Sequence, residues 1–167
     1  VVIGIENERA ETQLKKLYEP LNLNEDNLLS TSLESAELIK YASNAFLATK
    51  ISFINELSAL CEKTGADIHA IAKGMGLDDR IGDKFLQVGP GFGGSCFPKD
   101  TLALIRISQE HGVSSRIVES VLEVNAAQKA RMVQKIRESL GGSEANKNIT
   151  VLGLTFKAET DDMRDAP

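Results

Sequence analysis

Apolar residues recur every three or four positions along most of this chain, and that spacing predicts a mainly helical protein. Local signals mark where the helices begin and end. Ser32 and Asp67 suit N-cap positions, while Gly65 suits the end of a helix. Pro98 suits the first turn of another helix. We therefore expect helices over residues 8–18, 33–63, 67–76, 98–112 and 115–141.

The longest predicted helix, residues 33–63, is the expected spine of the protein. Its buried stripe is expected to consist of Leu38, Ala42, Ala45, Phe46, Thr49, Phe53, Leu57 and Leu60. Small residues such as Ala42, Ala45 and Ala48 would let a second helix approach closely. The later helix adds further apolar positions, at Ile117, Val118, Val121, Leu122 and Val124. Because this exceeds what a small helical unit hides in its own core, we expect a homodimer through the helical region.

Two apolar stretches, Val1–Ile5 and Ile149–Leu154, read as buried strands, and Leu28–Thr31 reads as a short extended piece. A strand near each end, with no partner beyond it, suggests a piece cut from a longer protein. The expected fold class is mainly α: a helical central domain with flanking strands from two truncated α/β, Rossmann-like domains. The expected divisions are residues 1–31, 32–142 and 143–167.

The amino-acid composition of the chain argues against several classes of function. The 42% hydrophobic and 26% charged residues are ordinary for a globular protein. A net charge of −5 without a basic cluster argues against a nucleic-acid partner. We expect no membrane span and no signal peptide. Two cysteines fit a reducing, cytoplasmic compartment, and two histidines without a Cys/His cluster give no reason to expect a metal site.

Residues 91–100, GFGGSCFPKD, carry the strongest chemical signal. Cys96 leaves a glycine-rich loop and enters a predicted helix, where unpaired amides and the helix dipole favour a thiolate. The glycines let a ligand approach the backbone closely. Asp100 follows about one turn later, where it could position a proton or a water. Cys96 is therefore the candidate nucleophile, whereas Cys61 lies mid-helix and is expected in the core.

Other patterns leave alternatives open. Residues 89–94 spell G-x-G-x-x-G, but no good strand precedes them and no acidic residue ends a second strand about twenty positions on. We therefore disfavour a dinucleotide-binding loop here. Lys40 and Asn44 lie four apart on one helix face, which fits either a solvated polar stripe or a functional pair. Arg80 would by default be an exposed loop charge.

The ten-residue segment resembles the active-site signature of the UDP-glucose/GDP-mannose dehydrogenase family. The likeness continues through residues 35–48 and 153–157 and covers essentially the whole chain. The resemblance implies a helical central domain, similar in architecture to that of 6-phosphogluconate dehydrogenases. The end of an NAD-binding domain would precede it, and the start of a nucleotide-sugar-binding domain would follow it.

The resemblance also implies roles for individual residues. Lys40 and Asn44 would be catalytic helpers that also contact substrate, beside Cys96 and Asp100. Arg80 would reach substrate across a dimer interface. The cradle for the sugar would be Phe85, Leu86, Gln87, Val88, Gly89 and the residues as far as Gly93. Near the C-terminal end, substrate would also contact Phe156 and Lys157, and NAD would contact Lys99 and Arg164.

The implied reaction oxidises C6 of a nucleotide-linked hexose twice with NAD, through a Cys96 thiohemiacetal and thioester. Phe97 and the approach to the glycine loop favour UDP-glucose, with GDP-mannose or another nucleotide sugar as the alternative. The isolated chain could instead be a non-catalytic dimerisation module. A decarboxylating dehydrogenase of the 6-phosphogluconate type is disfavoured, because such enzymes do not use a cysteine nucleophile.

Overall fold

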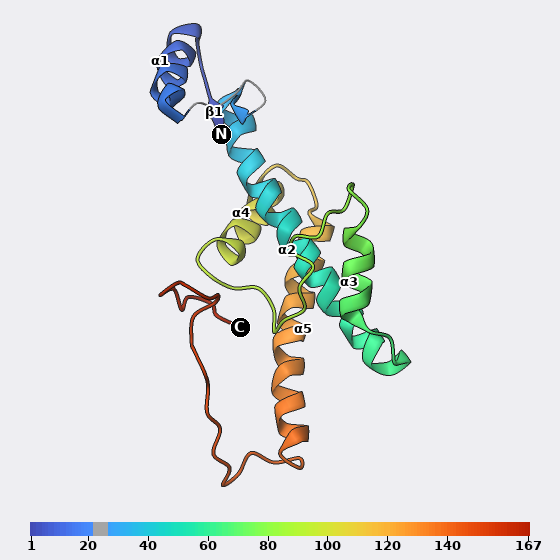
Figure 1. The fold of residues 1–167 in the computed structure, drawn as a ribbon. Helices are drawn as coiled ribbons and strands as arrows, with labels where there is room; N and C mark the ends of the chain where they lie inside the picture. The colour runs from blue at the N-terminus through green and yellow to red at the C-terminus, as the bar shows by residue number, and fades with distance from the viewer. Residues whose placement is uncertain (22–26) are drawn as a thin grey trace. The chain divides into compact units, whose positions relative to one another are not determined.

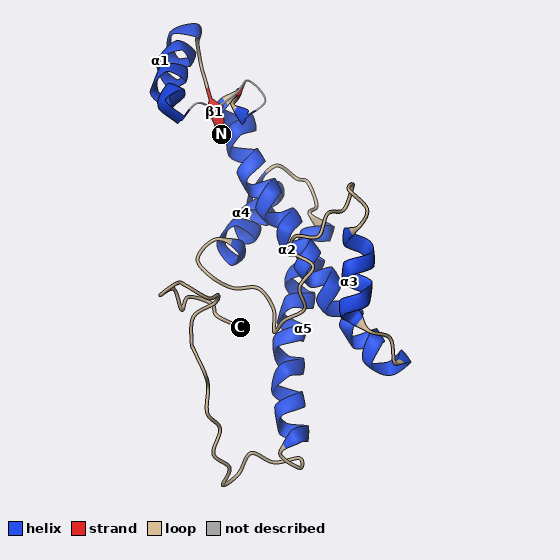
Figure 2. Cartoon of the chain, viewed as in Figure 1, coloured by secondary structure: helices blue, strands red, loops and turns tan. Residues whose placement is uncertain are grey.

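The computed structural model describes residues 1–21 and 27–167. It forms two compact units, Val1–Ser43 and Asn44–Pro167, and the division falls within the longest helix. The described residues are mainly helical, as the sequence predicts, with two short strands (Figures 1 and 2). Residues 22–26, part of the segment 1–31 predicted as a domain remnant, lie outside the described residues. In the part that is described, no helix is long and apolar enough to cross a membrane.

The first unit opens with a strand, a helix and a second strand. These are β1 (Val2–Gly4), α1 (Glu8–Tyr18) and β2 (Leu29–Thr31), with a short 3-10 turn η1 (Glu19–Leu21) after α1. The strands pair in parallel, with Ile3 opposite Ser30. The Asn7 side chain caps α1 by accepting from the Ala10 amide at 2.9 Å. The first strand and helix form as predicted, but only Ile3 of the strand is buried.

The remaining helices begin and end close to the predicted positions. They are α2 (Leu33–Thr64), α3 (Ile68–Gly76), α4 (Phe97–Glu110) and α5 (Arg116–Ser139). Local chemistry explains the boundaries: Asp67 accepts from the His69 amide at the start of α3, and Gly65 takes a positive φ of 76° after α2.

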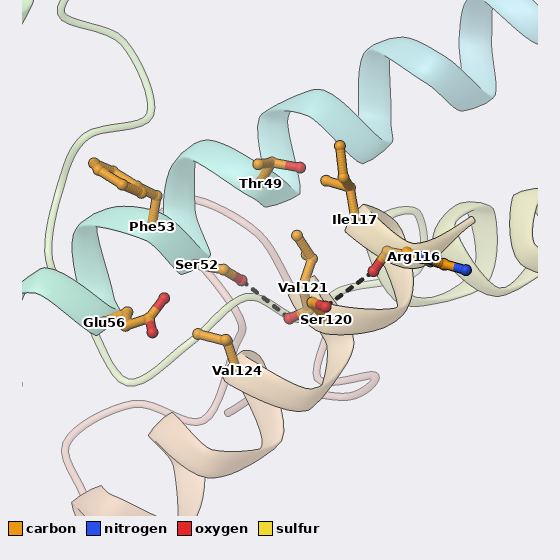
Figure 3. Close-up of a pocket in the computed structure, with 9 residues that line it drawn as sticks. All are labelled: Thr49, Ser52, Phe53, Glu56, Arg116, Ile117, Ser120, Val121 and Val124. Atoms are coloured by element: carbon orange, nitrogen blue, oxygen red, sulfur yellow. Dashed lines mark hydrogen bonds between the residues drawn. The ribbon is translucent and has the colours of Figure 1, made fainter. Parts of the chain in front are cut away.

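The core of the second unit lies where α2, α5 and the glycine loop meet. Ala48 from α2, Phe92 from the loop and Val121 from α5 form a buried cluster. Its partly buried neighbours are Ile51, Phe97 and Leu122. The two helices also share a polar contact, because the Ser52 hydroxyl donates to the Val121 carbonyl at 3.2 Å (Figure 3). The loop is therefore an integral part of the core.

The predicted buried stripe of α2 is largely wrong. Phe46, Phe53 and Leu60 are 66%, 50% and 57% exposed, and Leu38 is also exposed. The buried residues of α2 are instead Ala45, Ala48, Ser52, Ile54, Asn55, Ser58 and Cys61. The helix carries apolar residues on more than one face, so spacing alone did not identify the packed one. The packed face consists mainly of small and polar residues.

The predicted strand Ile149–Leu154 is also wrong. Among the described residues the only paired strands are β1 and β2, and residues 149–154 form no regular element. Val151 and Leu152 are 66% and 94% exposed. A strand requires a neighbour for its backbone hydrogen bonds, and the second unit supplies none.

Candidate active site around Cys96

Cys96 stands at the N-cap of α4, where the sequence predicts a helix start. Its side chain is exposed and not in a disulfide. Its carbonyl accepts from the Asp100 amide at 2.8 Å, which begins the helical hydrogen bonding. Pro98 lies in the first turn, where its missing N–H costs nothing. The Ser95 hydroxyl lies 3.8 Å from the Cys96 sulfur.

Asp100 and Asn44 form a close pair. The Asn44 amide donates to Asp100 Oδ2 at 2.6 Å, and the Lys99 ammonium lies 3.8 Å from Oδ1. Asp100 is only 1% exposed. A buried carboxylate needs such polar partners to offset its lost hydration. The structure therefore brings two predicted site residues, from α2 and α4, into direct contact one turn from Cys96.

The glycine loop is close-packed on both sides. Gly91 has φ 133° and Gly94 has φ 82°, conformations that side-chain-bearing residues rarely adopt. A Cβ at Gly91 would come within 2.7 Å of Asn125 Oδ1, and a Cβ at Gly94 within 2.9 Å of the Phe156 ring. Because glycine has no side chain at these two positions, α5 can pack against the loop at Gly91 and the C-terminal segment can pack against it at Gly94.

A cavity of about 310 Å³ adjoins the loop. Most of the predicted cradle lines it, and the full lining is Ile51, Phe85, Gln87, Val88, Gly89, Gly91, Phe92, Gly93, Phe97, Phe156 and Lys157. Leu86, also predicted as a substrate contact, does not line this cavity and is 4% exposed. Phe85 has φ 65°, a strained conformation for a bulky residue. Residues predicted to bind substrate from distant parts of the sequence thus line one cavity.

The C-terminal segment is held against the glycine loop by its backbone. The Arg164 carbonyl accepts from the Gly94 amide at 2.9 Å. The Arg164 guanidinium forms two hydrogen bonds to the Asp162 carboxylate, at 2.8 and 3.0 Å. These bonds lower the pKa of Asp162, and Ser95 adds a smaller contribution in the same direction. The pKa of Arg164 is raised, chiefly by Asp162 and in lesser part by Cys96. Arg164 therefore pairs with Asp162 beside the glycine loop.

The other predicted residues lie apart from this cluster or belong to the first unit. Arg80 is exposed and forms a fork with Asp78, at 2.9 and 2.6 Å; this pairing lowers the pKa of Asp78. Lys40 belongs to the first unit, where its ammonium lies 5.7 Å from the centre of the Tyr41 ring. Cys61 is buried, as predicted.

Several polar residues that bind the backbone of the glycine loop were not predicted from the sequence. Asn55, Asn125 and Gln128 are all buried and all hydrogen-bond its backbone. The available signal was a polar pair, Asn125 and Gln128, three apart on the apolar face of a helix. Asn55 gave a weaker signal, because the wrong face of α2 was expected in the core.

We predict that Cys96 reacts with iodoacetamide much faster than Cys61. Cys96 is exposed at a helix start, whereas the Cys61 residue is 4% exposed, and a thiol must be accessible to react. Peptide mapping after brief treatment at neutral pH gives the ratio. Faster labelling of Cys61 would contradict the assignment of Cys96 as the accessible thiol.

The chain is similar in sequence to known proteins. The chain is 52% identical over 169 residues to UDP-glucose 6-dehydrogenase of Rhizobium meliloti, covering all of this chain and 39% of that protein. It is 54% identical over 167 residues to UDP-glucose 6-dehydrogenase of Rickettsia bellii, covering 100% of the chain and 38% of the relative. It thus spans about two fifths of the length of these relatives.

The fold is also similar to solved structures. A UDP-glucose dehydrogenase from the archaeon Pyrobaculum islandicum superimposes with a TM-score of 0.92 and 44% identity, over 99% of this chain and 37% of that one. Residues 34–127 match the family model described as the UDP-glucose/GDP-mannose dehydrogenase family, central domain. This chain belongs to the UDP-glucose/GDP-mannose dehydrogenase family.

Proposed function

We propose that an enzyme containing this chain is an NAD-dependent UDP-glucose 6-dehydrogenase, which oxidises UDP-glucose to UDP-glucuronate. The observation that carries the proposal is the exposed Cys96 at the start of α4, one turn from the buried Asp100–Asn44 pair. Relatives named as UDP-glucose 6-dehydrogenases, matching across the whole chain, support the choice of substrate. In this proposal residues 32–142 are the catalytic and dimerising domain, between the remnant 1–31 and the beginning of a substrate-binding domain at 143–167.

Cys96 forms the covalent intermediate in this mechanism. After the first oxidation its thiolate attacks the C6 aldehyde, forming a carbon–sulfur bond and a thiohemiacetal. Loss of hydride from that carbon gives a thioester. Water then adds to the thioester carbon, the carbon–sulfur bond breaks, and the carboxylate leaves while the thiol is restored.

Asp100 and Asn44 assist the last step. The Asp100 carboxylate, held by Asn44 at 2.6 Å, is positioned to orient a water or accept its proton. Asn44 can also donate to the oxyanion of the tetrahedral intermediate. The role proposed for Lys40, stabilising that oxyanion, rests on the family's sequence pattern.

The proposed substrate site is the cavity beside the glycine loop, and the proposed cofactor contacts are two exposed cations. The 310 Å³ cavity lined by the cradle, Phe156 and Lys157 is proposed to hold the nucleotide sugar. Lys99 and Arg164 are 73% and 71% exposed, so both cations are accessible to the phosphates of NAD. When bound, NAD accepts the hydride in each oxidation. A reducing cytoplasm fits an enzyme that depends on a free Cys96 thiol.

We propose that the assembly is a homodimer, formed through an exposed groove between α2 and α5. Its lining includes Phe53, Ile117 and Val124 (Figure 3), and the groove volume is about 300 Å³. Phe53 and Ile117 are 50% and 72% exposed, which is costly for apolar side chains unless a second copy covers them. Arg80 is proposed to contact the substrate held by the partner.

For the enzyme that contains this chain, we predict that Cys96→Ser lowers UDP-glucuronate formation from UDP-glucose by at least about 10³-fold. Serine is a far weaker nucleophile at neutral pH, while the cavity stays intact, so the affinity for UDP-glucose should change little. The amount of uronate in samples quenched at set times gives the activity, and calorimetric titration gives the affinity for UDP-glucose. Cys61→Ser is the matched control and should retain activity.

Uronate formation at the wild-type rate by Cys96→Ser would contradict the covalent route. Oxidation of GDP-mannose in preference to UDP-glucose by the wild-type enzyme would change the assigned substrate and leave the chemistry intact.

We predict that the 18.1 kDa chain sediments as a dimer at micromolar concentration. Ile117→Glu should shift it toward monomer, because a charge in an apolar interface loses its hydration. Leu77→Glu is the control, since Leu77 is 77% exposed, close to the 72% of Ile117, but lies outside the groove. Sedimentation equilibrium showing a wild-type monomer, or equal effects of the two variants, would contradict the proposed interface.

A further inference from the structure

The backbone of Gly89 is held on both of its polar groups by side-chain amides. Its N–H donates to Asn55 Oδ1, from α2, at 2.9 Å. Its carbonyl accepts from Gln128 Nε2, from α5, at 2.8 Å. The N–H and the carbonyl of Gly89 are therefore each held by a side chain from a different helix.

Phe92, three residues later, is held by a single amide. Its N–H donates to Asn125 Oδ1 at 2.8 Å, and its carbonyl accepts from Asn125 Nδ2 at 3.0 Å. Asn125 approaches so closely that a Cβ on Gly91 would lie 2.7 Å from its oxygen. The stretch from Gly89 to Phe92, which contributes three residues to the cavity lining, is thus pinned at both of its ends.

All three of these side-chain amides are buried in the protein. Asn55, Asn125 and Gln128 are 1%, 8% and 5% exposed. Burying a polar side chain costs free energy unless it is hydrogen-bonded, and an apolar side chain would pack there more cheaply. Asn125 uses both the donor and the acceptor of its amide on Phe92, so it fixes the register of that backbone as well as its distance. Asn55 uses its acceptor on Gly89, and Gln128 uses its donor.

A second layer of contacts reaches the Gln128 amide and the backbone of Asn55. Arg131 donates to Ser58 Oγ at 3.2 Å and to Gln128 Oε1 at 3.5 Å. Ser58 in turn donates to the Asn55 carbonyl at 2.6 Å. Arg131 also pairs with Glu62. The network therefore links both residues that hold Gly89 to a partly exposed ion pair.

We propose that Asn55, Asn125 and Gln128 are positioning residues, which set the cradle backbone at Gly89–Phe92 in the shape that binds the nucleotide sugar. They act through the backbone and do not touch the reacting atoms. The substrate part of this inference rests on the proposed function. Fixing a binding loop before the substrate arrives reduces the entropy cost of binding.

The first test compares Gln128→Met with Gln134→Met in the enzyme that contains this chain. Both glutamines lie on α5, but Gln134 is exposed and bonds only Glu138 among the hydrogen bonds resolved for its side chain. Methionine keeps the length of the side chain and removes the donor. Gln128→Met should raise KM for UDP-glucose about tenfold or more while kcat changes by less than about threefold. Gln134→Met should change neither.

The second test does not depend on activity. Hydrogen exchange of the nucleotide-free protein, followed by mass spectrometry, measures peptides covering residues 85–93. Asn125→Leu should speed exchange at the Phe92 amide at least about tenfold, because that N–H loses its acceptor. Exchange in α3 should stay unchanged.

The outcomes separate the two proposals. Equal KM for the two Met variants of an active enzyme, or a fall in kcat with unchanged KM, overturns the positioning role. Unchanged exchange at residues 85–93 in Asn125→Leu overturns it as well. If the wild-type enzyme oxidises no nucleotide sugar, the proposed function fails, and the exchange measurement still decides whether the amides fix the loop.

Discussion

The position of the glycine loop in the second unit depends on the two hydrogen bonds between Asn125 and the backbone of Phe92, at 2.8 and 3.0 Å. They hold Phe92 where its ring joins Ala48 and Val121 in the core. Phe97 then packs against the Phe92 ring, with the ring centres 6.1 Å apart and nearly perpendicular. Because Phe97 is the first residue of α4, this packing also fixes the position of Cys96. The loop is therefore ordered by a buried amide and an aromatic contact rather than by regular secondary structure.

Buried polar contacts also account for the packed face of α2. Asn55 accepts from the Gly89 amide of the loop, Ser52 donates to the Val121 carbonyl of α5, and Ser58 donates to the Asn55 carbonyl. The large apolar side chains Phe46, Phe53 and Leu60 remain on exposed positions. In the proposed dimer, Phe53 lines the groove that a second copy covers. One helix would thus serve the site with its polar face and the assembly with its apolar face.

The sequence predicted what local chemistry determines. Asp67, Gly65 and Pro98 mark helix boundaries through bonds to nearby residues, and those boundaries were correct within a few positions. The prediction of the buried face of α2 was wrong, because the packed side depends on which distant segment lies against it. The strand at Ile149–Leu154 was wrong for a related reason, since the second unit gives it no partner. The site residues divide in the same way: Cys96 and Asp100 share a local motif, but Asn125 could be connected to Phe92 only by the fold.

In the proposed reaction Cys96 carries the sugar as a thioester, which water held by Asp100 releases. The most direct measurement is the mass of the Cys96 peptide in an Asp100→Asn variant of the enzyme that contains this chain, quenched during turnover with UDP-glucose and NAD. Slowed hydrolysis is expected to leave a sugar-derived acyl adduct on Cys96 and to leave Cys61 unmodified. UDP-glucuronate formed while Cys96 stays unmodified at every time point, or an adduct on another residue, would contradict it.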